Sequence, residues 1–113
     1  MREPALRILE DPNRVFLSSP FLRHEVLPKA IFNKRSVECR FYRKYFRRAI
    51  MCANLDSILR LAVKESTRSG VGAMDSLHLA AARLLRAGEF ITTEKPSKSI
   101  HRTTLVRITY LYA

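Results

Sequence analysis

Residues 74–95, MDSLHLAAARLLRAGEFITTEK, contain the clearest change of secondary structure in the chain. The first part is rich in Ala and Leu and predicts a helix over Met74–Ala87, with Gly88 at the position that commonly follows a helix. The next residues, Phe90–Thr93, are apolar or β-branched and predict a short strand that ends before Glu94. A helix followed directly by a short strand is typical of an α/β protein.

The rest of the chain extends this alternation. Ser19 followed by Pro20 is a favourable helix start, and Asn54 and Ser69-Gly70 are expected to begin and end a later helix. The other predicted helices are Glu3–Glu10, Phe21–Phe32 (which Pro28 is expected to kink or shorten), Ser36–Ala49 and Leu55–Arg68, and the other predicted strands are Val15–Leu17 and Leu105–Tyr112. Val15–Leu17 is continuously apolar, as in a strand buried on both faces of a parallel sheet. The sequence therefore predicts one α/β domain over residues 1–113, with a mostly parallel sheet.

The composition limits the class of protein. The chain has 113 residues, of which 47% are hydrophobic, and this is enough apolar material for one core. No apolar run approaches the roughly 20 residues of a membrane span, and no secretory signal is recognised. Cys39 and Cys52 are too few for a disulfide scaffold, so a reduced, cytoplasmic location is expected. The net charge of +11 favours an anionic partner, nucleic acid first.

Three acidic residues are candidates for chemistry. Glu94 follows the Phe90–Thr93 strand, Asp75 is in the first turn of the preceding helix, and Glu25 is early in the helix after the first strand. Because ligands of open α/β sheets gather beyond the carboxyl ends of strands, we expect these three side chains to form one cluster. Carboxylates suit Mg²⁺ or Mn²⁺, which prefer oxygen ligands. The structural alternative is that Asp75 caps the helix dipole and that both glutamates are solvated.

Five cations form a basic face on the predicted helix Ser36–Ala49. They recur at helical spacing and are Arg40, Arg43, Lys44, Arg47 and Arg48. This basic face is a candidate for binding the RNA backbone or an acidic protein segment, and the alternative is a solvated surface. The aromatic residues of the same helix are on its opposite side, where core or homodimer contacts are expected; they are Phe41, Tyr42, Tyr45 and Phe46.

Histidine and cysteine give weaker signals. His78 is three residues after Asp75 on one helix face, so a hydrogen bond between them is feasible, and we interpret His78 as a structural residue. His24 and His101 show no partner pattern. Cys39 and Cys52 lack the paired spacing of a zinc site, so we expect them to serve packing.

Three sequence blocks together resemble the PIN-domain family. They are Ser18–Leu27 (SSPFLRHEVL), Met74–Ala82 (MDSLHLAAA) and Glu89–Lys95 (EFITTEK), in matching order and separation. PIN domains have a three-layer α/β/α fold and are Mg²⁺- or Mn²⁺-dependent nucleases, and many small bacterial ones are VapC-type toxins paired with an antitoxin. The resemblance implies a metal-dependent endoribonuclease of a toxin–antitoxin pair, with Glu25, Asp75 and Glu94 at the family's acidic positions. The last position is commonly aspartate in the family.

The same resemblance predicts a missing element. The family begins with a strand that ends in an aspartate, and no such strand precedes the predicted helix Glu3–Glu10, so we expect an N-terminally incomplete domain without the first acidic ligand. Asp11 does not replace that ligand, because it follows the helix. We therefore expect a marginal fold and a poor nuclease. The alternative function is a catalytically inactive PIN-like module that binds an antitoxin or RNA through its basic face.

Overall fold

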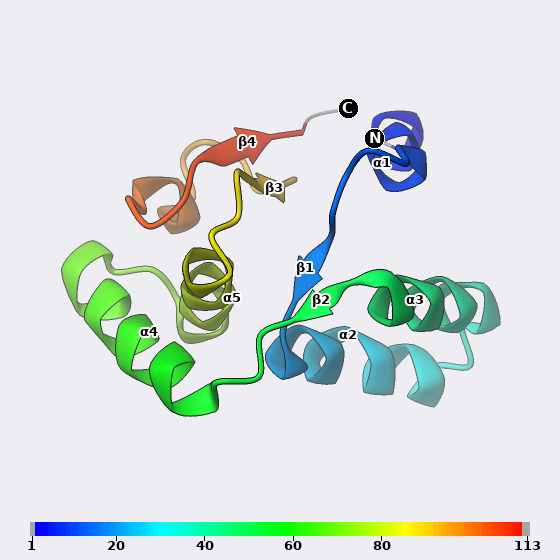
Figure 1. Cartoon of the computed structure of the whole chain (residues 1–113), viewed down its shortest axis with the longest axis horizontal. Helices are drawn as coiled ribbons and strands as arrows, with labels where there is room; N and C mark the ends of the chain where they lie inside the picture. The colour runs from blue at the N-terminus through cyan, green and yellow to red at the C-terminus, as the bar shows by residue number, and fades with distance from the viewer. Residues whose placement is uncertain (1, 112–113) are drawn as a thin grey trace.

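The helices and strands of the computed structural model, which describes residues 2–111 and the side chains of residues 4–111, lie in two groups (Figure 1). The first group contains α1 (Arg2–Glu10), β1 (Leu17–Ser18), α2 (Pro20–Phe32), α3 (Ser36–Arg48) and β2 (Ile50–Met51). The second contains α4 (Leu55–Ser69), α5 (Ala73–Leu84), β3 (Phe90–Thr92), the 3₁₀ helix η1 (Ser99–Arg102) and β4 (Ile108–Tyr110). Within the described residues, none of these helices combines the length and the apolarity needed to cross a membrane.

Local chemistry sets the start of α2. The hydroxyl oxygen of Ser19 accepts a hydrogen bond from the backbone N–H of Leu22 at 3.4 Å, and Pro20 occupies the first turn, as predicted. The helix then continues through Pro28 to Phe32, so the predicted shortening is wrong. The tertiary packing of α2 offsets the loss of one helical N–H at the proline.

Helices α4 and α5 end in different ways. Gly70 ends α4 with a φ of 75°, a left-handed conformation in which a side chain would be strained. The expectation for α5 is wrong, because α5 ends at Leu84 and Arg86, not Gly88, takes the left-handed conformation with a φ of 58°. The turn after α5 therefore accepts a strained non-glycine residue, and Gly88 lies in the connection to β3.

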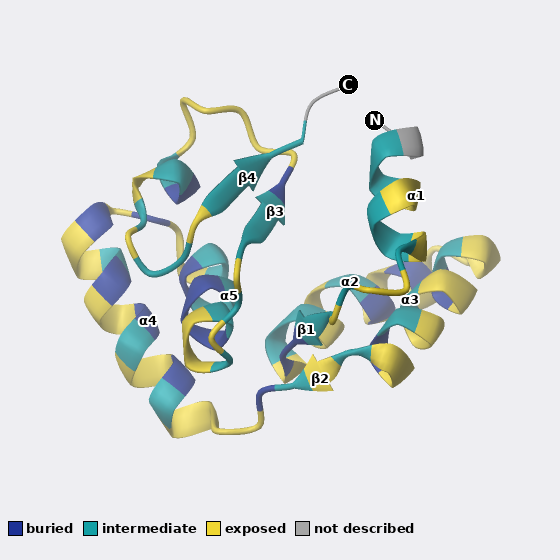
Figure 2. Cartoon of the chain, turned by 45° about the horizontal axis from the view of Figure 1, so that its top comes forward, coloured by how far each residue is buried: buried dark blue, intermediate teal, exposed yellow. Residues whose placement is uncertain are grey.

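The core is organised around α5 (Figure 2). One cluster of buried side chains contains Cys52, Ile58, Ala62, Ala80 and Ala81, and the other contains Val71, Leu79 and Ile100. Ile58 and Leu79 are fully buried, and burial of each contributes about 1.5–3 kcal/mol. Because α5 supplies residues to both clusters, it fixes the α4 side of the molecule against the C-terminal strands and against β1.

The strands form two separate parallel pairs. Leu17 pairs with Ile50 in the β1–β2 pair, and Phe90 pairs with Ile108 in the β3–β4 pair. The α/β class with parallel strands is thus confirmed, whereas the described strands do not form one continuous sheet. Val15 lies outside β1 and is 70% exposed, so the expectation that it is buried on both faces of a sheet is wrong.

Several strand boundaries differ from the sequence-based expectation, and β3 ends at Thr92, one residue before the predicted Thr93. The first strand begins at Leu17, two residues later than predicted, and the last begins at Ile108 instead of Leu105. Tyr112, the predicted end of the last strand, lies outside the described residues. The β2 strand was not predicted, because two residues carry no periodic pattern.

Candidate functional site

The three predicted acidic residues come from three separate segments that the fold brings into electrostatic range of one another. Glu25 is in the second turn of α2, Asp75 is in the first turn of α5, and Glu94 follows β3 by two residues. Asp75 is partly buried, while Glu25 and Glu94 are exposed on either side of it. We call these residues the acidic trio.

The pKa of Asp75 is raised by its surroundings, which include the other two carboxylates of the acidic trio. Burial is the largest cause that raises the pKa of Asp75; the His78 imidazole lowers this pKa, and the carboxylates of Glu94 and Glu25 raise it further. The ionised form of Asp75 is therefore opposed by its surroundings. A cation placed among the three carboxylates would relieve this repulsion.

His78 contacts a different member of the acidic trio than the sequence suggested. Its Nε2 atom lies 3.1 Å from Oε1 of Glu25, and the described residues show no hydrogen bond between His78 and Asp75. Because an ionised carboxylate only accepts hydrogen bonds, Nε2 carries the proton and donates it to Glu25. His78 thus joins α5 to α2 and holds Glu25 beside the start of α5.

The backbone of Glu94 is fixed at both ends. Its N–H donates to the hydroxyl oxygen of Thr92 at 3.1 Å, and its C=O accepts from Nε2 of His101 at 2.8 Å. The ring of His101 also packs edge-on against Tyr110, with 6.1 Å between ring centroids. His101 is therefore a positioning residue for Glu94. No local pattern in the sequence indicates this contact, because the two residues meet only through the loop that follows β3.

The donor atoms of the acidic trio fit a hard cation such as Mg²⁺ or Mn²⁺ by their chemistry and their charge. Within residues 4–111, no three His, Cys, Asp or Glu side chains are arranged to hold a metal ion together. One reason is the pairing of Glu25 with His78, which turns this carboxylate toward the imidazole. Metal binding at this site therefore requires that Glu25 exchange or share its imidazole partner.

Among the described residues, four cations of the basic face of α3 form no ion pair, whereas the fifth, Arg48, contacts other groups of the molecule. Arg40, Arg43, Lys44 and Arg47 are exposed, and among the described residues none of them forms an ion pair. These four side chains remain available for an anionic partner. Only part of the aromatic side of α3 packs inward: Phe46 is buried and the hydroxyl of Tyr45 donates to the C=O of Leu17 at 3.0 Å, whereas Phe41 is 41% exposed.

Arg48, the fifth predicted member of the basic face, is engaged within the molecule. Its guanidinium donates to the backbone carbonyls of Leu9, Asp11 and Arg14 at 3.1, 3.2 and 3.4 Å. It also lies over the ring of Phe16, 4.7 Å from the centroid, in a cation–π contact. Arg48 therefore ties the segment between α1 and β1 to α3.

Arg23 of α2 lines a small pocket together with two arginines of the basic face. Arg23 of α2, together with Arg43 and Arg47 of α3, surrounds a pocket of about 350 Å³ whose remaining walls are Leu27 and Phe46. We call this site the arginine pocket. Sequence reasoning missed Arg23, because its neighbours on α3 are 20 or more residues away in the chain and only helix packing brings them together.

Comparison of the chain with protein-family models, with curated proteins and with solved structures finds no match.

Proposed function

We propose that this chain is a PIN-type, metal-dependent endoribonuclease that serves as the toxin of a toxin–antitoxin pair, with a three-layer α/β/α fold. One observation carries the proposal: Glu25 and Glu94, from different segments, both act on the charge of the partly buried Asp75. Three carboxylates that converge from separate elements disfavour the ionised form of Asp75, and such an arrangement is characteristic of functional sites.

The residues of the chain have distinct parts in this proposal. Glu25, Asp75 and Glu94 would hold Mg²⁺ or Mn²⁺. When bound, the ion supplies an activated water and offsets negative charge on the phosphodiester during hydrolysis. His78 holds Glu25 in place, and His101 fixes the backbone that carries Glu94. The free cations of α3 attract the RNA backbone or an acidic antitoxin segment.

A metal-binding measurement tests the acidic trio without relying on activity. We would titrate Mn²⁺ into the chain and follow free Mn²⁺ by electron paramagnetic resonance. Asp75→Asn should weaken binding by at least about tenfold, because it removes the central carboxylate. Asp56→Asn is the matched control, since Asp56 occupies the first turn of α4 as Asp75 does in α5. Equal binding by the wild type and Asp75→Asn would contradict the site.

The arginine pocket favours a second candidate function. Three arginines face one small pocket, and no described carboxylate pairs with any of them, as expected for a surface that receives an anionic partner. The chain would then be a catalytically inactive PIN-like module that binds RNA or an acidic antitoxin. RNA binding that persists in EDTA, without cleavage in Mg²⁺, would favour this second function over the first.

A further inference from the structure

Each of the two parallel strand pairs has two outer edges that no described strand covers, and two of these edges belong to β1 and β3. In a parallel ladder, alternate residues direct their N–H and C=O groups to opposite sides of the strand. Phe90 and Thr92 bond to β4, so the backbone groups of Ile91 point to the other edge of β3. By the same alternation, the backbone groups of Leu17 point away from β2; its C=O accepts from the hydroxyl of Tyr45, and its N–H bonds to no described backbone group. No described strand pairs with either edge.

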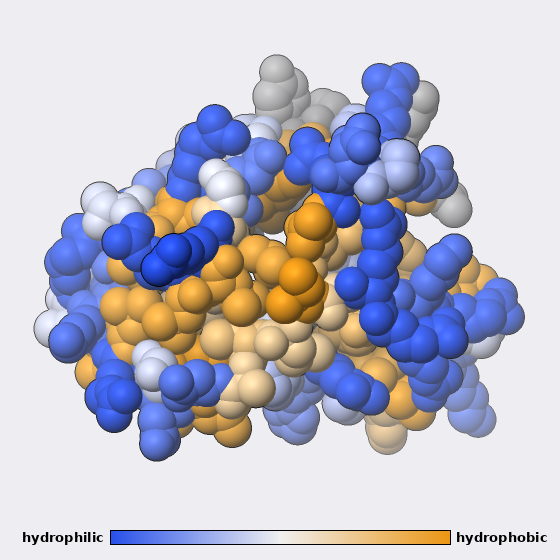
Figure 3. Space-filling view, viewed as in Figure 1, coloured by the Kyte–Doolittle hydropathy of each residue, from blue (hydrophilic) through white to orange (hydrophobic). Residues whose placement is uncertain are grey.

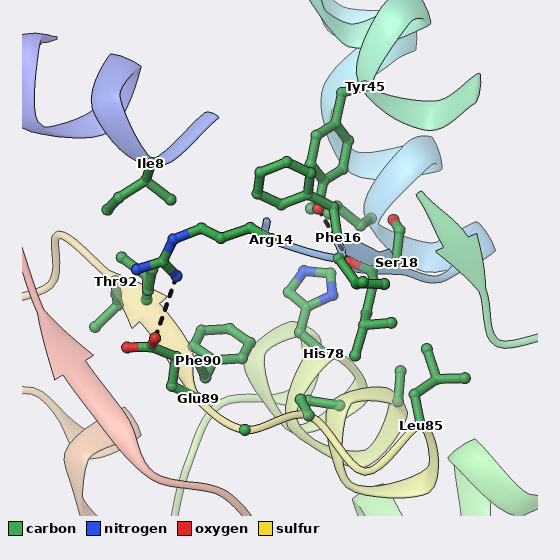
Figure 4. A pocket seen from close by; sticks show the side chains of 18 of the residues that line it. Ile8, Arg14, Phe16, Ser18, Tyr45, His78, Leu85, Glu89, Phe90 and Thr92 are labelled. Carbon is green, nitrogen blue, oxygen red and sulfur yellow. Dashed lines mark hydrogen bonds and ion pairs between the residues drawn. The ribbon is translucent and has the colours of Figure 1, made fainter. Parts of the chain in front are cut away.

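Both free edges line one cavity, which we call the central cleft. It has a volume of about 590 Å³ and is bounded by β1, β3, the inner side of α1 and one face of α5. Figure 4 shows the ring of His78 pointing into the central cleft with Phe16 and Phe90 on either side, while Arg14 reaches across to Glu89 at 3.2 Å. The surface of this face of the molecule is apolar across its middle, between hydrophilic groups (Figure 3).

Two polar atoms in the wall of the central cleft are buried without a hydrogen-bond partner among the described residues. They are Oγ of Ser18, a residue that is 6% exposed, and Nδ1 of His78. Because Nε2 of His78 donates to Glu25, Nδ1 is left without a partner; it accepts a hydrogen bond in the neutral imidazole and donates one in the protonated ring. Buried polar atoms are normally paired, so these two atoms indicate an occupant that brings hydrogen-bonding groups of its own.

We propose that the central cleft binds one extended, apolar β-strand of a partner polypeptide, between β1 and β3. Such a strand meets each demand of the site: its backbone pairs with the edges at Leu17 and Ile91, its apolar side chains fill the cleft, and its polar groups reach Ser18 and His78. A strand covered on both faces is expected to be a continuous run of Val, Ile or Leu. This inference goes beyond the proposed nuclease function and does not depend on a bound metal.

Charge favours a foreign strand over a second copy of the same chain. Each copy carries a net charge of +11, so two copies repel each other, whereas an acidic segment is attracted and a neutral one is not repelled. Each described strand of a second copy is also already paired on one edge within its own molecule. It therefore has one free edge, whereas a strand between β1 and β3 uses both of its edges. A second copy is therefore an alternative occupant that the experiment must separate.

Synthetic peptides test the proposal on the intact chain. The probe is a fluorescein-labelled peptide of five alternating Val and Ile residues with two Glu at each end, and its control carries N-methyl groups on alternate residues. Both peptides have the same charge and nearly the same apolarity, but the control cannot donate along one edge. We expect the control to bind at least about tenfold more weakly in fluorescence anisotropy, because at least two backbone hydrogen bonds are lost. Equal binding of both peptides, or no binding of either, would overturn the proposal.

A pair of proline variants tests which edge is used. Ile91→Pro removes the N–H at the free edge of β3 but no hydrogen bond to β4, and we expect it to weaken peptide binding about three- to tenfold. Met51→Pro removes the corresponding N–H from the outer edge of β2, away from the cleft, and should change binding by less than about twofold. Equal effects of the two variants would contradict the site.

Hydrogen exchange provides a readout that needs no variant. Peptide binding to the wild-type chain should slow exchange of the backbone amides of Leu17 and Ile91 relative to that of Met51. Protection confined to other residues would overturn the proposal. If sedimentation shows that the chain alone is a dimer in which the Leu17 and Ile91 amides are already protected, the occupant is a second copy and the proposal of a foreign strand is wrong.

Discussion

Nε2 of His78 lies 3.1 Å from Oε1 of Glu25, and this contact joins α5 to α2 across 53 residues of sequence. The same imidazole lowers the pKa of Asp75, three residues before it on α5. One histidine therefore interacts with two of the three carboxylates in the acidic trio. Burial and the other carboxylates nevertheless keep the pKa of Asp75 raised, so ionisation of Asp75 destabilises the folded state.

Asp75→Asn should stabilise the metal-free protein at pH 7. Burial raises the pKa of Asp75 in the folded state above its unfolded value of about 3.9. The contribution of this group to stability is therefore fully present below about pH 3.9, and it is lost as the pH rises through the folded pKa. In EDTA, we expect the variant's Tm to exceed that of the wild type by about 2–4 °C at pH 7, and the difference to vanish below about pH 4. The control Asp56→Asn should lower Tm slightly, because its carboxylate favours the start of α4. A lower Tm for Asp75→Asn at pH 7 would contradict the raised pKa.

The free cations of α3 should govern the salt dependence of RNA binding. Arg43→Gln combined with Arg47→Gln removes two phosphate contacts, so the slope of log K against log salt should fall by about 1.4 for single-stranded RNA. Arg60→Gln combined with Lys64→Gln is the matched control, because these exposed cations have the same i, i+4 spacing on α4 and the same total charge. If both double variants change the slope equally, the basic face is a general surface and not a binding site.

Arg48 should behave as a structural residue. Arg48→Gln loses the hydrogen bonds to three backbone carbonyls, and we expect the Tm to fall by about 5 °C, which corresponds to roughly 1 kcal/mol. Trypsin should also cleave faster after Arg14, because the segment between α1 and β1 is no longer held. Arg40→Gln removes an exposed cation of the same helix and should leave both measurements unchanged. A reduced RNA salt slope without a lower Tm would show that Arg48 acts as an RNA contact instead.

An ion pair between a buried carboxylate and an exposed guanidinium, near the C-terminal strands, should affect the stability of the protein in acid. Glu65 is 3% exposed, and both of its oxygens accept from Arg68 at 2.9 Å while one also accepts from the hydroxyl of Thr103. The hydrogen bonds from Arg68 are the largest cause that lowers the pKa of Glu65, although burial acts in the opposite direction. Stability from this pair is therefore present above the unfolded pKa of about 4.3 and is lost as pH falls through the lower folded pKa.

Glu65→Gln tests this ion pair. We expect the Tm to fall by about 5 °C at pH 7, because the neutral amide loses its charge-assisted hydrogen bonds to a half-exposed guanidinium, and the deficit to shrink below about pH 4. The control Glu38→Gln breaks an exposed pair with Arg35 and should change the Tm by less than about 3 °C. A deficit that is the same at pH 3 and pH 7 would show that ionisation of Glu65 does not contribute.

Local signals in the sequence predicted the helices better than the strands. Ser19-Pro20, Asn54 and Gly70 fix helix ends through contacts within a few residues, and all three behave as expected. The end of α5 is different, because Arg86 adopts a conformation that local preference assigns to glycine. The short strand Ile50–Met51 forms because β1 lies beside it, which no local pattern records.

In the candidate site, too, the sequence predicted some features, while others depend on contacts between distant segments. The sequence identified Glu25, Asp75 and Glu94 as a set, and the fold brings them within electrostatic range. It did not identify the contact of His101 with Glu94, because that contact depends on how a loop folds back. The central cleft was also beyond prediction from periodicity, since it results from the separation of two strand pairs and not from any one segment.

Cleavage of RNA by the intact chain tests the central claim most directly. End-labelled RNA would be incubated with the wild type, Asp75→Asn and the control Asp56→Asn in Mg²⁺, in Mn²⁺ and in EDTA. The proposed function predicts slow cleavage by the wild type and by Asp56→Asn in either metal, none in EDTA, and a rate at least about 100-fold lower for Asp75→Asn. Cleavage that persists in EDTA, or that is equally fast with Asp75→Asn, or that is absent from the wild type in both metals, would contradict a metal-dependent nuclease built on Glu25, Asp75 and Glu94.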